Sequence, residues 1–218
     1  MPQQKTDWTQ VWAKGSIGFH KDHTNPLLEK YLPLLNECPH ILVPLCGKTL
    51  DLHFLHQKGH SCSGIEAVSQ AIQEFFSDWN VQPTVSYKPL LNFQHEGITL
   101  YKQDIFQLRT ADLSPIDAIY DRAALVAFHP DLQKKYVEHI LPFLPKGGKI
   151  LLITFEMPRS IYKGPPYSLS PATVREMYDT HTQKITLLEE SIQHENDSPW
   201  LKERGLAWCK THAWLMEI

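Results

Sequence analysis

The sequence predicts an α/β fold with a mostly parallel seven-stranded sheet, helices on both faces and an antiparallel hairpin at the C-terminal end. Two observations indicate this fold. Short β-like apolar runs alternate with longer helical patterns, and only a loop separates the last two β-like runs. The chain has 218 residues and neither an internal repeat nor a low-complexity tract. We therefore expect a single domain of Rossmann-like type over residues 1–218.

Seven apolar runs supply the predicted strands, which are residues 41–45, 61–66, 98–101, 117–121, 149–155, 184–192 and 206–217. The run at 149–155 is apolar nearly throughout, as expected for a central strand that is covered on both faces. Residues 83–97 contain turn residues and are interpreted as an irregular or hairpin insertion before the third strand.

Helical periodicity and capping residues predict the helices between these strands. The signals are Trp8 and Trp12 four residues apart, a periodic run at 50–55 that Gly59 ends, Ser69 before an apolar pattern, residues 131–144 after His129-Pro130, and Ser170-Pro171. Ser170 is expected at the N-cap of the last helix and Pro171 at its first position. The first helix lies in residues 1–40, which we expect to form an N-terminal helical lid.

Charge and composition exclude several function classes. A formal net charge of -3 with a pI of about 6.4 offers no general attraction for nucleic acid or anionic membranes. The N-terminus is polar, and no stretch approaches the ~18 apolar residues of a membrane span. We therefore expect a cytoplasmic, monomeric protein that binds neither nucleic acid nor membranes.

Cysteine and histidine spacing gives no support to a metal site. The four cysteines show no CxxC pairing, so free thiols in a reducing compartment are expected. His53 and His56 share one helix face, but no HExxH pattern or grouped acidic ligand accompanies them. We predict that the protein holds no metal.

The turn after the first strand indicates the kind of ligand. The apolar run stops at the single glycine Gly47, and about twenty residues later the second strand ends on Glu66. A carboxylate there can accept hydrogen bonds from ribose hydroxyls, whereas the alternative is a solvated surface glutamate. A pyrophosphate loop needs several glycines, so one glycine favours a nucleoside without phosphates. S-adenosylmethionine is the common ligand of this kind.

Two further side chains are candidates for this site. Arg122 follows the fourth strand and can orient a cofactor carboxylate or stabilise negative charge on a substrate; the alternative is an ion pair with Asp121 or another acid that fastens a turn. Trp12 either packs its helix on the core or covers an adenine or a sulfonium by cation–π attraction.

Several strings of this chain resemble the thiopurine S-methyltransferases, particularly the bacterial members. The resemblance runs almost end to end, and its most specific strings are Val43-Pro44-Leu45-Cys46-Gly47-Lys48 and Asp121-Arg122-Ala123-Ala124-Leu125-Val126-Ala127. Ile17-Gly18-Phe19-His20, Gly64-Ile65-Glu66 and Gly164-Pro165-Pro166-Tyr167 match as well. The resemblance implies a class I methyltransferase that transfers a methyl group from S-adenosylmethionine to the sulfur of a thiopurine or related aromatic thiol, leaving S-adenosylhomocysteine.

The resemblance also implies roles for individual residues. The residues expected to contact S-adenosylmethionine are Trp12, Leu45, Gly47, Glu66, Asp104, Ile105 and Arg122. The acceptor pocket would be lined by Phe19, Pro166 and Tyr167, and Arg122 is the candidate catalytic residue because a cation lowers the pKa of a nearby thiol. Residues 196–204 match the family only loosely, which leaves the acceptor less well defined than the donor.

Two alternatives remain open from the sequence. The acceptor is a thiopurine-like thiol or, alternatively, an inorganic or small organic sulfur, selenium or tellurium compound. In another class, the chain is an S-adenosylmethionine-binding interaction module without turnover. Glu66 and Arg122 together argue against a degenerate site.

Overall fold

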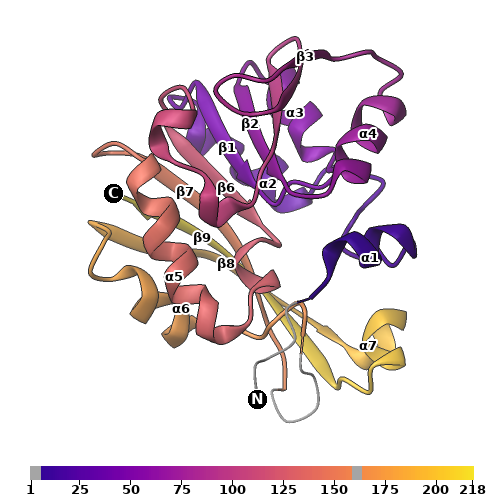
Figure 1. Ribbon diagram of the computed structural model, residues 1–218. Helices are drawn as coiled ribbons and strands as arrows, with labels where there is room; N and C mark the ends of the chain where they lie inside the picture. The colour runs from indigo at the N-terminus through magenta and orange to yellow at the C-terminus, as the bar shows by residue number, and fades with distance from the viewer. Residues whose placement is uncertain (1–5, 159–163) are drawn as a thin grey trace.

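The sheet has nine strands in the order β3-β4-β5-β2-β1-β6-β7-β9-β8. The computed structural model describes residues 6–158 and 164–218, and Figure 1 shows its helices packed around the twisted sheet. The strands are β1 His40–Pro44, β2 Ser61–Glu66, β3 Thr84–Ser86, β4 Asn92–His95, β5 Ile98–Lys102, β6 Ala118–Arg122, β7 Lys149–Glu156, β8 Lys184–His194 and β9 Trp208–Glu217.

The predicted topology is confirmed for seven of these strands. β5, β2, β1, β6 and β7 are parallel, while β9 pairs antiparallel with β7 and β8 pairs antiparallel with β9. The prediction of seven strands is wrong by two, because the insertion at 83–97 forms a hairpin, β3–β4, that pairs antiparallel with β5. These strands are short and lie at the sheet edge, so they lack the apolar runs by which buried strands are found.

Seven α-helices occur among the described residues. They are α1 Trp8–Ala13, α2 Pro26–Tyr31, α3 Asp51–Gln57, α4 Ser69–Asp78, α5 Pro130–Ile140, α6 Pro171–Tyr178 and α7 Pro199–Glu203. The predicted cap of α6 is confirmed, because the Ser170 hydroxyl accepts a hydrogen bond from the Thr173 N–H at 3.2 Å. Ser69, predicted as an N-cap, is instead the first residue of α4, because the extended residue before it is Val68.

The helices bury a hydrophobic cluster on each face of the sheet. α5 and α6 pack on one face, and α2, α3 and α4 pack on the other. Alternation along β1 sends Leu42 into the first cluster and its neighbours Ile41 and Val43 into the second. Leu28 and Leu35, which lie in the N-terminal 40 residues, are fully buried in the second cluster. In the described part of the chain, none of the helices has the length and apolar character needed to cross a membrane.

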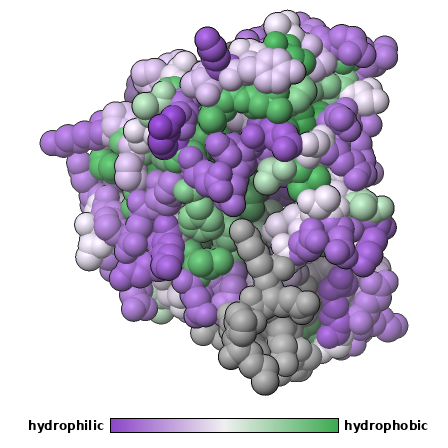
Figure 2. Space-filling model, in the orientation of Figure 1, coloured by the Kyte–Doolittle hydropathy of each residue, from purple (hydrophilic) through white to green (hydrophobic). Residues whose placement is uncertain are grey.

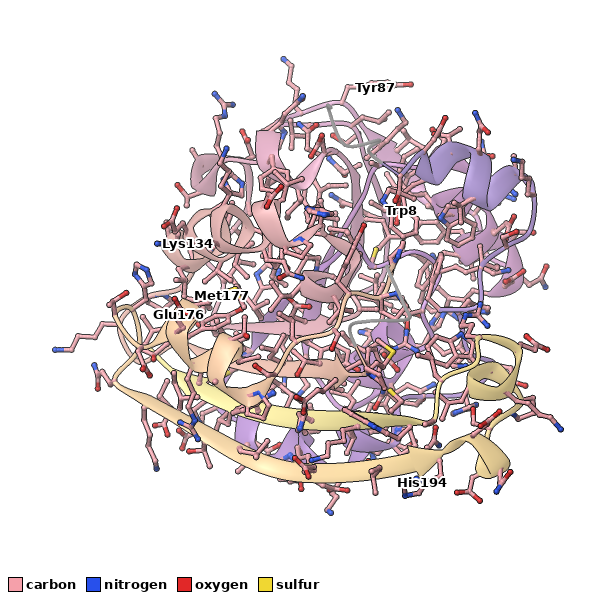
Figure 3. The ribbon with its side chains drawn as sticks, turned by 90° about the horizontal axis from the view of Figure 1, so that it is seen from below. Trp8, Tyr87, Lys134, Glu176, Met177 and His194 are labelled. Atoms are coloured by element: carbon pink, nitrogen blue, oxygen red, sulfur yellow. The ribbon has the colours of Figure 1, made fainter. Side chains whose placement is uncertain are left out.

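Among residues 6–158 and 164–218, few large apolar side chains are exposed. On the face in Figure 2, hydrophobic side chains gather toward the middle and top, with hydrophilic ones around them. Tyr87, beyond the end of β3, points outward in Figure 3 and is among the most exposed of the large apolar side chains. The carboxyl ends of the five parallel strands meet at one edge of the sheet, which is where open α/β folds bind ligands.

Candidate active site

The turn after β1 has an unusual backbone. Leu45 and Gly47 both have positive φ angles, 47° and 54°. Glycine adopts such angles freely, but a leucine there costs about 1–3 kcal/mol that the surrounding contacts must offset. A Cβ atom at Gly47 would also lie 3.2 Å from the Trp12 ring. Glycine is therefore favoured both by the backbone of the turn and by the close approach of Trp12.

Glu66 fastens this turn from the end of β2. One carboxylate oxygen accepts a hydrogen bond from the Gly47 N–H at 2.9 Å, and the other accepts from the Val68 N–H at 2.7 Å. The side chain is 8% exposed, so it is not the solvated surface glutamate of the alternative interpretation. Burial raises the pKa of the carboxyl, and the backbone N–H groups of Val68 and Gly47 oppose that rise. Each oxygen keeps lone-pair capacity for a further donor, such as a ribose hydroxyl.

Lys48, the residue after the turn glycine, faces helix α4. Its ammonium pairs with Glu74 at 2.8 Å and with Asp78 at 3.0 Å. The hydrogen bond to Glu74 is the main reason why the pKa of Lys48 is raised. This cation is therefore committed to carboxylates of the protein.

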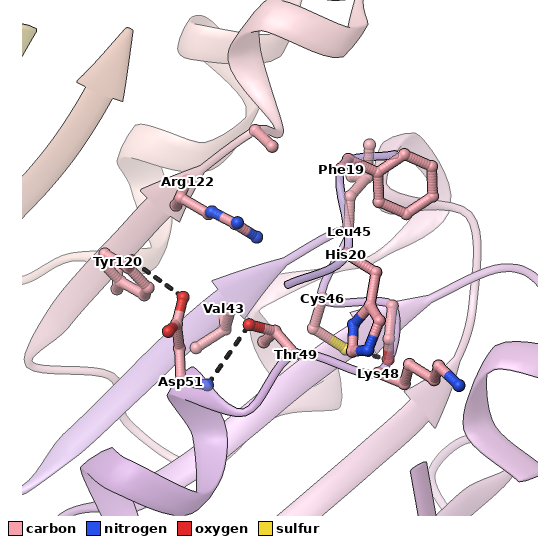
Figure 4. Close-up of a pocket in the computed structure, with 12 residues that line it drawn as sticks. Phe19, His20, Val43, Leu45, Cys46, Lys48, Thr49, Asp51, Tyr120 and Arg122 are labelled. Atoms are coloured by element: carbon pink, nitrogen blue, oxygen red, sulfur yellow. Dashed lines mark hydrogen bonds between the residues drawn. The ribbon is translucent and has the colours of Figure 1, made fainter. Parts of the chain in front are cut away.

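Arg122, at the end of β6, extends into a cavity beside the turn (Figure 4). Residues from several elements line this cavity: Phe19, His20, Val43, Leu45, Cys46, Gly47, Lys48, Thr49, Asp51, Tyr120, Arg122 and Ala123. Across residues 6–158 and 164–218, the guanidinium has no hydrogen-bond or ion-pair partner. The cavity thus contains a cation that is available to an anionic group.

Asp121 does not pair with its neighbour Arg122. Its carboxylate accepts hydrogen bonds from the N–H groups of Ala124 at 3.2 Å and Leu125 at 3.1 Å, and from the Tyr136 hydroxyl at 2.7 Å. Adjacent strand residues point to opposite faces, so Asp121 lies under α5 while Arg122 faces the cavity. The alternative in which this pair fastens a turn is therefore wrong.

Ala123 is a second lining residue of the cavity with a strained backbone, in addition to Leu45. Ala123 follows Arg122 with a φ of 67°, just as Leu45 follows β1 with a φ of 47°. β1 and β6 are neighbours in the sheet, and both residues line the cavity. Left-handed non-glycine residues cluster at functional sites because they aim the adjoining groups.

Asp51 and Tyr120 form a buried polar pair in the cavity wall that sequence reasoning missed. Asp51 is 1% exposed; one carboxylate oxygen accepts from the Asn25 N–H at 2.8 Å and the other from the Tyr120 hydroxyl at 2.9 Å. Burial, with the nearby charge of Asp51, raises the pKa of Tyr120 well above its ordinary value. The one available signal was the position of Asp51 at the start of α3, four residues after Gly47.

The N-terminal segment closes one side of the turn. Trp12 is 3% exposed and packs with Val68 and Ala71, so the packing alternative holds for most of its surface. The Phe19 ring meets the Trp12 ring edge-on with 5.8 Å between centroids, and Phe19 lines the cavity.

The predicted residues that lie outside the lining of this cavity are Trp12, Glu66, Asp104, Ile105, Pro166 and Tyr167. Asp104 follows β5; its carboxylate accepts from the Phe106 N–H at 3.0 Å, and Ile105 is buried beside it. The backbone joins them to the Glu66 end of the sheet, since the Gln103 N–H donates to the Glu66 carbonyl at 3.0 Å.

Pro166 and Tyr167 lie in a separate loop near η4, the short 3₁₀ turn Leu125–Ala127. The Tyr167 N–H donates to the Val126 carbonyl at 2.6 Å. A Cβ atom at Gly164 would fall 2.6 Å from the Tyr167 ring, so this ring packs directly on the glycine.

No metal centre accompanies the site. Within the ranges that the structure covers, 6–158 and 164–218, no group of three or more His, Cys, Asp or Glu side chains is arranged to hold a metal ion.

Comparison with known proteins gives concordant matches over the whole chain. The family model described as Thiopurine S-methyltransferase matches residues 3–217. A Thiopurine S-methyltransferase of Photobacterium profundum is 36% identical over 219 residues, covering 97% of this chain and 97% of the relative. Another, from Legionella pneumophila (strain Paris), is 37% identical over 214 residues and covers 95% of each chain.

Solved structures support the fold. A Burkholderia thailandensis 1,6-didemethyltoxoflavin-N1-methyltransferase with bound S-adenosylhomocysteine is similar, with a TM-score of 0.62 and 14% identity, over 98% of this chain and 86% of that one. The N-methyltransferase NodS from Bradyrhizobium japonicum WM9, also in complex with S-adenosylhomocysteine, has a TM-score of 0.58 and 16% identity, over 90% and 89%. The predicted class I methyltransferase fold is thereby confirmed.

Proposed function

Because the chain belongs to the thiopurine S-methyltransferase family and is an S-adenosylmethionine-dependent methyltransferase, we propose that it methylates the sulfur of a thiopurine or related aromatic thiol. We propose further that the cavity beside Arg122 is where the donor and the acceptor meet. The observation that carries this proposal is the Arg122 guanidinium, which enters the cavity with no partner among the described residues.

The polar and apolar groups of the site fit the chemical groups of S-adenosylmethionine. Glu66 has acceptor capacity left for two ribose hydroxyls, and the buried Ile105 offers an apolar contact for adenine. Arg122 suits the carboxylate of the methionine part, and Asp51 suits its ammonium group. Lys48 is paired with acids of α4, so the site makes no provision for phosphates.

The chemistry supplied by the bound donor is a methyl group on a sulfonium, which passes to the acceptor sulfur as the donor carbon–sulfur bond breaks and its electron pair remains on the donor as a neutral thioether. The protein has to align the acceptor and exclude water. Phe19, whose ring packs edge-on against the buried Trp12, supplies apolar aromatic surface at the cavity. Arg122 favours the ionised form of an acceptor thiol by electrostatic attraction, which raises the reactive fraction.

We propose that Pro166 and Tyr167 line the acceptor side, as the family resemblance implies. Their loop is joined to η4, the turn that follows β6, through the Tyr167–Val126 hydrogen bond, which supports this role.

The lid role of the N-terminal segment is also a proposal. Trp12 contacts the Gly47 turn, and Phe19 lines the cavity, so a movement of the segment that carries them would open or close the site. Residues 1–5 lie outside the described part of the chain. Leu28 and Leu35 are fully buried, so the moving portion would end before α2. We expect a monomer, which light scattering would test.

A methyl-transfer assay with labelled S-adenosylmethionine tests the function. The acceptors are thiopurines, thiophenols, selenite and small RNAs. We expect turnover on thiopurines and thiophenols. Preference for selenite would support the alternative acceptor class of inorganic or small organic sulfur, selenium or tellurium compounds. Turnover on RNA alone would overturn the proposal. Binding of S-adenosylhomocysteine without turnover on any acceptor would support the non-catalytic alternative.

A further inference from the structure

His20 occupies the same cavity as Arg122 but has no assigned role. Its imidazole lines the cavity together with Phe19, Lys48 and Arg122 (Figure 4). The side chain is half-buried. Its backbone N–H is held by the Ile17 carbonyl at 2.8 Å, which fixes the direction of the loop. In the described portion of the chain neither ring nitrogen has a hydrogen-bond partner. A half-buried polar ring without a partner is suited to bind a group that enters the cavity.

The charges around His20 favour its neutral form. Burial is the main cause that lowers its pKa, and the positive charge of Lys48 is the second. Arg122 acts in the same direction, whereas Asp78 and Glu74 on α4 oppose it. Those two acids are themselves paired with Lys48, which weakens their stabilisation of the protonated imidazole. Asp22, two residues along the chain, is bonded to His23 instead, at 2.8 Å.

A neutral imidazole has a free lone pair on one nitrogen, so it can accept a proton. The other polar groups of the cavity do not serve as the base. Asp51 accepts from the Tyr120 hydroxyl at 2.9 Å and is the proposed partner of the donor ammonium group. Burial raises the pKa of Cys46 well above its ordinary value, so this thiol stays protonated. Arg122 has no lone pair to offer. Among these groups, His20 is the one suited to receive a proton.

Methylation of a thiol requires that a proton leaves it, because the thiolate is the nucleophile. We propose that His20 is the general base that takes the S–H proton of the acceptor, with Arg122 stabilising the thiolate. This inference rests on the proposed function. The sulfur–hydrogen bond breaks, its electron pair stays on sulfur, and the proton moves to the free ring nitrogen. The thiolate then forms its bond to the methyl carbon, and His20 passes the proton to solvent.

Two acceptor thiols of different acidity show whether His20 acts as a base or has only a structural role. 4-Nitrothiophenol is almost fully ionised at pH 7, so it needs no base, whereas benzyl mercaptan is almost fully protonated. We expect His20→Gln to lower kcat/KM for benzyl mercaptan by about a hundredfold, the usual contribution of a general base, and to change the value for 4-nitrothiophenol by less than about threefold. Equal losses for both acceptors would overturn the proposal, since they would indicate a positioning effect.

The control is His23→Gln, which removes an exposed imidazole from the same segment. We expect it to leave both values unchanged; a loss like that of His20→Gln would overturn the proposal. Wild-type protein that methylates neither thiol nor thiopurines would refute the proposed function itself. Wild-type protein that methylates 4-nitrothiophenol but not benzyl mercaptan would refute only the base, because such an enzyme uses only thiols that are already ionised.

The pH profile gives a second test that does not depend on the folding of His20→Gln. With benzyl mercaptan, kcat/KM of the wild type should fall below the pKa of His20, which lies under its ordinary 6.5. Lys48→Met removes a cation that lowers this pKa, so the fall should move to higher pH. An acid limb that is absent, or that stays in place in Lys48→Met, would contradict the role of His20.

Discussion

The Glu66 carboxylate accepts a hydrogen bond from the backbone N–H of Gly47 at 2.9 Å. One side chain thereby joins the carboxyl ends of β1 and β2, and its second oxygen holds the Val68 N–H before α4. The acid proposed to bind ribose therefore also shapes the turn that is proposed to contact the rest of the donor. Effects on binding and on stability must be measured separately at this position.

Glu66→Ala should weaken S-adenosylhomocysteine binding by about tenfold or more, because charge-assisted hydrogen bonds contribute about 1.5–3 kcal/mol each. It should also lower the free energy of unfolding by about 2 kcal/mol, because two backbone N–H groups lose their acceptor. Titration calorimetry and urea unfolding measure the two effects. Glu138→Gln, on the exposed face of α5, is the control for binding. Unchanged affinity in Glu66→Ala would contradict the ribose role.

Arg122→Ala should lower turnover on thiophenol by about a hundredfold, comparable to the removal of one electrostatic stabiliser. Donor affinity should fall by less than about tenfold, because Glu66 and the turn remain. Arg122→Lys keeps the charge without the planar fork, so it should recover part of the rate. Steady-state kinetics and calorimetry on the same samples test this.

The control for Arg122 is Arg109→Ala, which removes an exposed guanidinium that pairs with Asp112. This variant should keep wild-type turnover. If Arg122→Ala lost turnover and affinity by the same factor, Arg122 would be a clamp for the donor only, and another group would have to stabilise the thiolate.

Local patterns were sufficient to predict most of the sheet. The limits of β2 are those expected, and Ser170 caps α6, because both signals lie within a few consecutive residues. The lone Gly47 and the strand-end Glu66 could likewise be found from spacing. For residues 83–97 the turn residues predict an irregular or hairpin insertion, and the choice between the two is not encoded locally because the short strands β3 and β4 bury little surface.

Long-range contacts account for what the sequence did not reveal. Asp51 is bonded to Asn25 and Tyr120, which lie 26 and 69 residues away. The bond between Glu66 and Gly47 spans 19 residues. Strand order decides which of these residues meet, and no local periodicity encodes those distances.

The pH dependence of stability should report on Asp121. Burial raises its pKa from 3.8 to about 6. The folded state therefore holds a proton that the unfolded state releases, and stability is lost as pH rises from about 4 to about 6. The difference corresponds to about 3 kcal/mol. Urea unfolding of the wild type and of Asp121→Asn from pH 4 to 8 should show the wild type losing stability relative to the variant over this window.

Tyr136→Phe sharpens that test. The Tyr136 hydroxyl donates to Asp121 at 2.7 Å and opposes the rise of its pKa. Without this donor the pKa should rise further, so the window should extend to higher pH. A constant difference between the wild type and Asp121→Asn at every pH would contradict the assignment of this titration to Asp121.

Gly64→Ala should lower stability and disturb the site, because it overpacks the strand under the Gly47 turn. Gly64 lies in the middle of β2, between β1 and β5, and a Cβ atom there would fall 2.4 Å from a methyl carbon of Leu100 and 2.8 Å from the Cys46 sulfur. Both neighbours are buried, so neither side chain can move into open space. Overpacking of this kind costs about 1–3 kcal/mol.

Because Cys46 directly precedes Gly47, a displaced Cys46 should also disturb the turn that Glu66 fastens, and donor affinity should fall together with stability. Gly18→Ala is the matched control for unfolding, since a Cβ atom at Gly18 meets nothing within 4 Å and its φ is not positive. Urea unfolding of both variants, with calorimetry of S-adenosylhomocysteine binding to Gly64→Ala, tests the argument. Lower stability with unchanged affinity would mean that the β1 turn holds its shape independently of the packing under it.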